Sequence, residues 1–176
     1  SLSDYFAAFE THPCLQGGFI WEWLDHGIAQ QTADGRKFWA YGGDFGETPH
    51  DANFVCDGLV WPDRTPHPGL YEFKHLAQPV AAQIVDAEQG IVRIVNKCDF
   101  VSLDWLRGEW ELLIDGAPAA SGNLPTLNIQ PSQSLTVTLD LSAFAGKPGE
   151  RLLNIRFFQR DATWWAPANH EIGWSQ

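Results

Sequence analysis

Residues 42–70, GGDFGETPHDANFVCDGLVWPDRTPHPGL, form the stretch that decides how this chain folds. Its five glycines and four prolines exclude one long helix or strand and predict a backbone with several fixed turns. Apolar side chains that can hold the stretch down are Phe45, Phe54, Leu59, Val60 and Trp61. A long ordered loop is uncommon unless it builds a site, although a solvated acidic loop is the alternative. The candidates for chemistry are Asp44, Glu47, His50, Asp51 and Asp57.

The composition is that of a soluble globular protein with one domain or two small ones, since 44% of its 176 residues are hydrophobic. No apolar run approaches the about 18 residues of a membrane span, and residues 1–10, SLSDYFAAFE, show no targeting signal. The net charge of -11 argues against nucleic-acid binding and favours a neutral substrate or a cation. Cys14, Cys56 and Cys98 lack metal-finger spacing, so we expect reduced, buried thiols in a cytoplasmic protein.

The first part of the chain carries helix and buried-strand signals. Apolar residues at helical spacing predict a helix over residues 2–10, and Pro66 and Pro68 mark the start of a second helix that ends before Pro79. Residues 19–24, FIWEWL, are typical of a strand buried on both faces. Because one such strand cannot complete a sheet, residues 1–78 are expected to be the C-terminal end of a larger α/β domain that continues upstream.

From Pro79 onward the apolar residues alternate with period two, which predicts an antiparallel β-sandwich over residues 79–176. Turns are expected at Asp115-Gly116 and at residues 121–123, among others. The candidate strands are residues 80–85, 91–97, 109–115, 135–139, 152–160 and 171–174.

The residues alone point weakly to chemistry on sugars. Carboxylates beside aromatic side chains are typical of the active sites of glycoside hydrolases, and the chain has nine tryptophans whose flat faces could stack on sugar rings. Ordinary core packing explains most of these tryptophans equally well. Asp44-Phe45-Gly46 matches a kinase metal-binding triplet, but the accompanying phosphate loop and catalytic loop are missing from the sequence.

Three sequence motifs indicate the fold and function more strongly than the composition does. Residues 17–25 (GGFIWEWLD), 41–58 (YGGDFGETPHDANFVCDG) and 63–75 (DRTPHPGLYEFKH) closely resemble the end of the catalytic barrel of bacterial β-galactosidases of glycoside hydrolase family two. The resemblance implies that residues 1–78 are the last part of a (β/α)8 TIM barrel, with Gly18–Trp23 as its eighth strand. An immunoglobulin-like antiparallel β-sandwich would follow over residues 79–176.

The resemblance also implies a function. The parent enzyme would be a homo-oligomeric, cytoplasmic retaining β-galactosidase that hydrolyses terminal β-D-galactose from small β-galactosides such as lactose. Trp21 would form a wall against the galactose, with the Phe54 ring beside the substrate. The Phe54 carbonyl and the Asp57 side chain would hold Na⁺, although many relatives carry asparagine at the position of Asp57. His50 stands where relatives have asparagine near a second Mg²⁺, and the main Mg²⁺ ligands would lie outside this chain.

The acid and nucleophile of the family are glutamates on earlier barrel strands, so no catalytic residue is expected in these 176 residues. Glu22 neighbours Trp21, but the alternation of a strand would turn it to the opposite face. The isolated chain is therefore expected to be inactive. Two alternatives remain open: a family-two enzyme for another sugar, such as a glucuronide or mannoside, and a carbohydrate-binding sandwich without catalysis.

Overall fold

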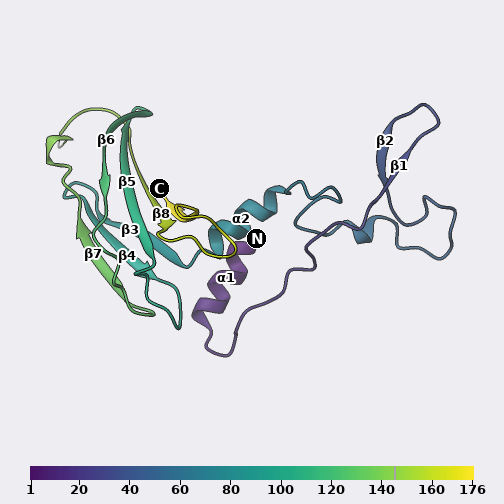
Figure 1. Cartoon of the computed structure of the whole chain (residues 1–176), viewed down its shortest axis with the longest axis horizontal. Helices are drawn as coiled ribbons and strands as arrows, with labels where there is room; N and C mark the ends of the chain where they lie inside the picture. The colour runs from purple at the N-terminus through teal and green to yellow at the C-terminus, as the bar shows by residue number, and fades with distance from the viewer. Residues whose placement is uncertain (145) are drawn as a thin grey trace. The chain divides into compact units, whose positions relative to one another are not determined.

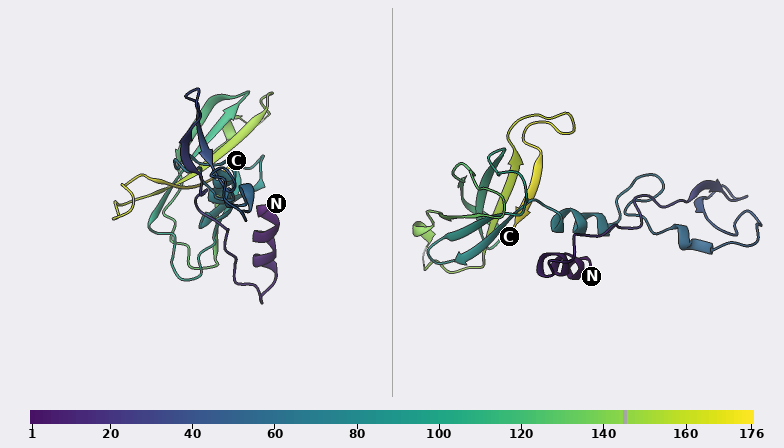
Figure 2. Two further views of the ribbon diagram at one scale, coloured as in Figure 1. Left: turned by 90° about the vertical axis from the view of Figure 1, so that its right-hand side faces the viewer. Right: turned by 90° about the horizontal axis from the view of Figure 1, so that it is seen from below.

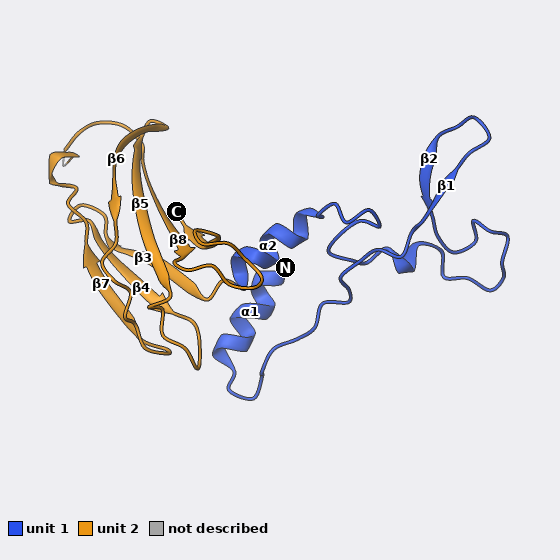
Figure 3. Cartoon of the chain, in the orientation of Figure 1, with its two compact units in different colours: residues 1–77 blue, residues 78–176 orange. Residues whose placement is uncertain are grey.

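A computed structural model describes residues 1–144 and 146–176. The chain divides into two compact units, Ser1–Ala77 (unit 1) and Gln78–Gln176 (unit 2), which carry different colours in Figure 3. Unit 1 holds both α-helices, and unit 2 is built mainly of strands.

The two helices expected in unit 1 are confirmed as α1 (Leu2–Thr11) and α2 (Pro68–Leu76). Asp4 completes a capping box with Ser1 at the start of α1, which satisfies backbone N–H groups that the helix leaves free. Pro68 occupies the first turn of α2, where its missing N–H costs nothing. The rings of Phe6 and Phe73 lie 6.1 Å apart, so the apolar faces of the two helices meet.

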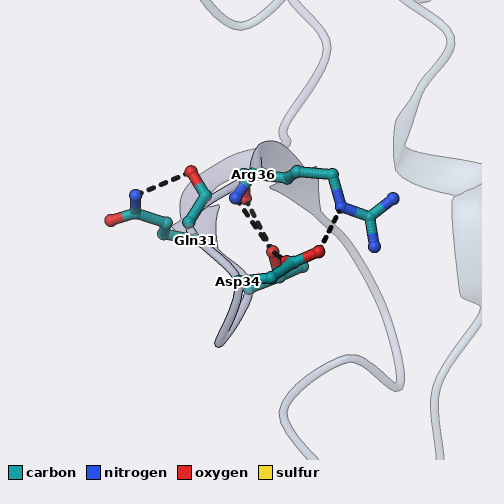
Figure 4. A network of polar contacts seen from close by, with 5 residues as sticks. Gln31, Asp34 and Arg36 are labelled. Atoms are coloured by element: carbon teal, nitrogen blue, oxygen red, sulfur yellow. Dashed lines mark hydrogen bonds and ion pairs between the residues drawn. The ribbon is translucent and has the colours of Figure 1, made fainter.

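A turn at Asp34-Gly35 joins β1 (Ile28–Gln31) to β2 (Lys37–Ala40) in an antiparallel hairpin. Polar contacts close this turn (Figure 4): Arg36 Nε donates to Asp34 Oδ2 at 2.9 Å, and Gln31 Nε2 donates to the Gly35 carbonyl at 2.8 Å. Gly35 has a φ of 88°, a conformation that glycine adopts without strain. The Thr32 hydroxyl is the main cause of the lowered pKa of the Asp34 carboxyl.

The strand expected over Gly18–Trp23 does not form in this chain. Most of the segment is exposed, and beside a few backbone hydrogen bonds to residues 57–60 its strand pairing is limited to an isolated parallel bridge between Leu24 and Val60. A strand buried on both faces needs hydrogen-bonding neighbours along both edges, and the described part of unit 1 supplies one short neighbour. The composition of FIWEWL is therefore insufficient by itself to form a strand.

Unit 2 contains two antiparallel sheets (Figures 1 and 2), with strand orders β3-β4-β7 and β6-β5-β8-β9. The strands are β3 (Val80–Asp86), β4 (Ile91–Asn96), β5 (Leu106–Ile114), β6 (Ala117–Asn123), β7 (Ser134–Thr138), β8 (Arg151–Gln159) and β9 (Glu171–Ser175). Short 3-10 turns occur at Ala52–Val55 in unit 1 and Ser142–Phe144 in unit 2. All six strands expected from the period-two pattern are present.

Strand β6 was not predicted, and the turn expected at residues 121–123 is wrong. Gly122 pairs with Trp110 of β5, and a side chain on Gly122 would come within 2.8 Å of the Trp110 indole nitrogen. A glycine that looks like a turn signal is therefore a strand residue that makes room for a large neighbour.

The core of unit 2 contains buried residues from both sheets, so the sheets face each other as a sandwich. Val92 and Ile94 alternate along β4, and Ile155 and Phe157 alternate along β8; all four are almost fully buried. The all-β sandwich expected after Pro79 is thereby confirmed. At its edge the buried Gln78 side chain makes two hydrogen bonds to the backbone of Trp174, at 2.9 and 3.1 Å.

The expectation of three buried thiols is wrong, because Cys14 and Cys56 are exposed and Cys98 is half-buried. Both exposed cysteines lie in the irregular parts of unit 1, which supply few neighbouring side chains. Neither helix in the described parts of the chain is long and apolar enough to cross a membrane.

Candidate functional site

Two segments of unit 1 run side by side at the centre of the candidate site. The Glu22 N–H donates to the Asp57 carbonyl at 3.1 Å, and the Leu59 N–H donates to the Glu22 carbonyl at 2.9 Å. Further along, the Val60 N–H donates to the Trp23 carbonyl and the Asp25 N–H to the Val60 carbonyl, each at 3.0 Å. The residue after Trp21 is therefore bonded directly to the turn that contains Asp57.

Gly58 allows these segments to approach so closely. A Cβ atom at this position would lie 2.4 Å from the Asp25 nitrogen and 2.5 Å from the Leu24 carbonyl carbon. The Gly58 N–H donates to Asp25 Oδ1 at 2.7 Å. Any side chain here would push the two segments apart. Their close approach therefore explains why the CDG motif has a glycine at position 58.

Asp25 and His67 form a pair that the sequence analysis missed. The Asp25 carboxylate is buried, and its second oxygen lies 2.8 Å from His67 Nε2. The His67 ring stacks on Trp61 with 4.5 Å between ring centroids, and the backbone N–H of His67 donates to the Leu59 carbonyl at 3.0 Å. The available signal was an acidic residue at the end of the apolar FIWEWL run, where a buried charge requires a partner.

Asp44 and Glu47, two of the candidate carboxylates, bind backbone N–H groups of their own loop. Glu47 accepts hydrogen bonds from Gly43 N at 2.6 Å and Phe45 N at 3.1 Å, and the Gly43 bond is the main cause of the lowered pKa of Glu47. Asp44 Oδ2 accepts from Tyr41 N at 2.8 Å. Both carboxylates therefore shape the loop, and the carbonyl of Asp51 accepts from Phe54 N in the following 3-10 turn.

His50 is also engaged within the loop. Its Nδ1 accepts a hydrogen bond from Ala52 N at 3.2 Å, which leaves the proton of a neutral ring on Nε2. The ring lies so close to Gly43 that a Cβ there would be 2.8 Å from His50 Cε1. Mg²⁺ prefers oxygen ligands, and the described residues contain no cluster of three or more His, Cys, Asp and Glu side chains that could hold a metal. The imidazole by itself does not fit a magnesium ion.

Asp57 fits a cation better. Its Oδ1 atom is buried and has no hydrogen-bond partner. A buried carboxylate oxygen without a partner is costly, so this atom suits a bound cation such as Na⁺. Trp21 and Phe54, the two aromatic candidates, are 79% and 74% exposed and therefore free to contact a ligand. Glu22, the remaining carboxylate beside Trp21, lies 3.1 Å from His26 Nε2.

Comparison with protein families divides the chain near the boundary between units 1 and 2. Residues 1–82 match the family described as "Glycosyl hydrolases family 2, TIM barrel domain". Residues 92–176 match the one described as "Beta-galactosidase, domain 4". The first match contains every candidate site residue, from Trp21 to Asp57.

The chain is similar along its length to bacterial proteins named β-galactosidase. It is 44% identical to one from Aeromonas hydrophila subsp. hydrophila and 40% identical to β-galactosidase 2 of Enterobacter cloacae. Identity to a β-galactosidase of Yersinia pestis bv. Antiqua (strain Angola) is 37%. Each alignment covers 99% of this chain but 17% of the relative, so the chain spans about a sixth of the relatives' length. These matches and relatives agree that the chain is similar to glycosyl hydrolase family 2 over residues 1–82 and to β-galactosidases along its length.

Proposed function

We propose that this chain is part of a retaining β-galactosidase and that unit 1 provides its sugar-binding wall and cation-binding turn. The observation that carries the proposal is the backbone bond between Glu22 and Asp57, which joins the exposed Trp21 to a carboxylate with a buried, unpartnered oxygen. The β-galactosidase relatives support the substrate class.

Trp21 offers a flat, exposed surface on which the apolar face of galactose can stack, and the exposed Phe54 ring offers a second. An aromatic wall of this kind contributes binding and orientation to the sugar. It neither donates nor accepts a proton.

Bond breaking by a retaining glycosidase requires an acid and a nucleophile about 5–5.5 Å apart on either side of the glycosidic bond. Four carboxylates around the loop already have other partners: Asp44 and Glu47 bind backbone N–H groups, Glu22 faces His26, and Asp25 faces His67. These contacts leave none of the four suited to the acid or nucleophile. The proposal therefore assigns Trp21, Phe54 and Asp57 the task of holding the substrate. The catalytic glutamates would lie on the preceding barrel strands.

The proposed cation is Na⁺, held by the Asp57 carboxylate and the Phe54 carbonyl. When bound, it would supply a positive charge that orients the oxygens of the sugar. Asp57 contributes a full negative charge where an amide oxygen would contribute a dipole, so this chain is expected to attract the ion more strongly.

Two finer features of the fold belong to the same proposal. In a complete (β/α)8 barrel, Gly18–Trp23 would gain a neighbour on each side and become the eighth strand, between helices α1 and α2. Unit 2 would be an immunoglobulin-like domain, because its strand orders β3-β4-β7 and β6-β5-β8-β9 match the A-B-E and C′-C-F-G sheets of that architecture. Homo-oligomeric assembly in the cytoplasm is part of the proposal by family resemblance.

The test uses the full-length protein and three nitrophenyl glycosides: the β-galactoside, the β-glucuronide and the β-mannoside. We expect the highest kcat/KM for the galactoside, with the β-anomer as the first product seen by proton NMR. A preference for either of the other sugars would reject the galactosidase assignment. Sugar binding by unit 2 without hydrolysis of any of the three would favour the carbohydrate-binding sandwich.

A further inference from the structure

Asp25 is the one charged side chain that is buried in the described parts of the chain, with 3% of its surface exposed. Burying a carboxylate is unfavourable unless hydrogen bonds replace its water. Both Asp25 oxygens have such partners, the Gly58 N–H at 2.7 Å and His67 Nε2 at 2.8 Å. The positions of these partners show what the buried charge can do.

The partners come from two places in the loop. Gly58 follows Asp57 directly, and His67 immediately precedes α2. Asp25 itself lies four residues after Trp21. One carboxylate therefore links the segment of the sugar wall, the cation turn and the beginning of the last helix of unit 1.

The backbone bonds between the two segments are few, and a short two-stranded pair of this kind specifies its register weakly. A shift by two residues would keep each side chain on its face but would move Trp21 away from Asp57. The bond from the Gly58 N–H to the buried carboxylate favours one register, because a residue with a Cβ in place of Gly58 would bring that atom within 2.4 Å of the Asp25 nitrogen.

We propose that Asp25, held by His67, is a positioning residue that fixes Trp21 relative to Asp57 and so couples sugar binding to cation binding. The proposal rests on the β-galactosidase function given above. His67 stabilises the second oxygen of Asp25 in either charge state of the ring, because Nε2–H can donate in both. The stacking of His67 on Trp61 in turn limits where that nitrogen can lie.

The test measures binding of a non-hydrolysable thiogalactoside to the full-length enzyme by isothermal titration calorimetry. The titrations are repeated over a series of NaCl concentrations, with choline chloride keeping the ionic strength constant. Asp25→Leu removes both acceptors and is expected to weaken thiogalactoside binding about tenfold and to diminish its dependence on sodium. Asp25→Asn is expected to bind nearly as wild type, because its amide can accept from Gly58 and donate to the other tautomer of His67.

Glu22→Gln is the matched control, since it changes a carboxylate in the same segment while the backbone bonds of Glu22 to the loop remain. It is expected to leave both the affinity and the sodium dependence unchanged. His67→Phe provides a second variant that keeps a ring on Trp61 but removes the donor to Asp25, with an expected loss of a few fold.

A loss of stability alone would not change the affinity of the folded fraction or its response to sodium. The positioning role would be overturned if folded Asp25→Leu kept the affinity and sodium dependence of the wild type. If Asp25→Leu does not fold, the same result in folded His67→Phe would overturn it. Either result would leave the galactosidase proposal standing. Failure of the wild-type enzyme to bind the thiogalactoside at any sodium concentration would instead overturn the proposed function, and the positioning role with it.

Discussion

The N–H of Glu22 donates a hydrogen bond to the carbonyl oxygen of Asp57 over 3.1 Å. This bond places the residue after Trp21 against the residue whose carboxylate has a buried oxygen without a partner. The proposed sugar wall and the proposed cation site are therefore parts of one local structure, although Glu22 and Asp57 lie 35 positions apart in the chain.

Replacing Asp57 with asparagine tests the cation site. The amide retains an oxygen but loses the negative charge, so Asp57→Asn should raise the half-saturating sodium concentration without abolishing activity, about fivefold for each kcal/mol of lost attraction. The measurement is activity of the full-length enzyme against NaCl, with choline chloride as the balancing salt. Asp63→Asn, which alters a loop carboxylate bonded to Thr65 N, is the control. Equal sodium requirements for wild type and Asp57→Asn would reject Asp57 as a ligand.

The thiol of Cys56 reports on the same turn. Although the residue is exposed, partial loss of water around the thiol raises its pKa, and the carboxylates of Asp25 and Asp57 raise it further. Because the thiolate is the reactive form, Cys56 should react with iodoacetamide more slowly than free cysteine at neutral pH, and its rate should continue to rise at more alkaline pH. Asp57→Asn removes one negative charge and should accelerate the reaction.

Mass spectrometry of the peptide that contains Cys56 provides the rates. A rate equal to that of free cysteine, unchanged by Asp57→Asn, would show that the thiol does not experience the charges of the turn.

Gln78 allows a test of unit 2. Gln78→Leu would leave the Trp174 N–H and carbonyl without their side-chain partners at a half-buried position, so the free energy of unfolding should fall by about 1–3 kcal/mol. Urea unfolding measures this loss. Gln83→Leu is the control, because Gln83 is exposed and its partner Arg93 can bond to water. A loss of the same size in both variants would mean that the hydrogen bonds between Gln78 and Trp174 contribute no more to stability than the exposed bond between Gln83 and Arg93.

The elements that depend on local pattern were predictable, and those that depend on distant partners were not. Helical spacing and Pro68 predicted α1 and α2, and alternation predicted six of the strands in unit 2. Gly18–Trp23 has the composition of a buried strand but lacks neighbours, and Gly122 looks like a turn because its strand role is to admit Trp110.

The same distinction applies to the site. The loop was predicted from its glycines, prolines and acidic residues, and its ordered turns agree with that. The Asp25–His67 pair joins residues that lie 42 positions apart, so no local pattern contains it. Asp44 and Glu47 looked available for chemistry because a sequence does not show which carboxylates bind their own backbone.

A polypeptide of these 176 residues alone should not hydrolyse an aryl β-galactoside. Glu22, Asp25, Asp44 and Glu47 are engaged with the backbone or with histidines, and the proposed catalytic glutamates lie on preceding barrel strands, so neither protonation of the leaving group nor covalent attack is expected. A colorimetric assay of the purified polypeptide checks this. Turnover that survives both Glu22→Gln and Asp44→Asn would mean that a catalytic pair lies elsewhere in these residues.

Trp21 is proposed to form the wall of a galactose site. In the full-length enzyme, Trp21→Ala should weaken a competitive galactose-type inhibitor by roughly 3–5 kcal/mol, or somewhat less where water fills the space, as for other large aromatic truncations. Trp164→Ala, which removes a 96% exposed tryptophan of unit 2, should leave the inhibition constant unchanged. A large increase in the inhibition constant for Trp21→Ala alone is the predicted result, and equal constants for both variants and wild type would contradict the proposed role of Trp21.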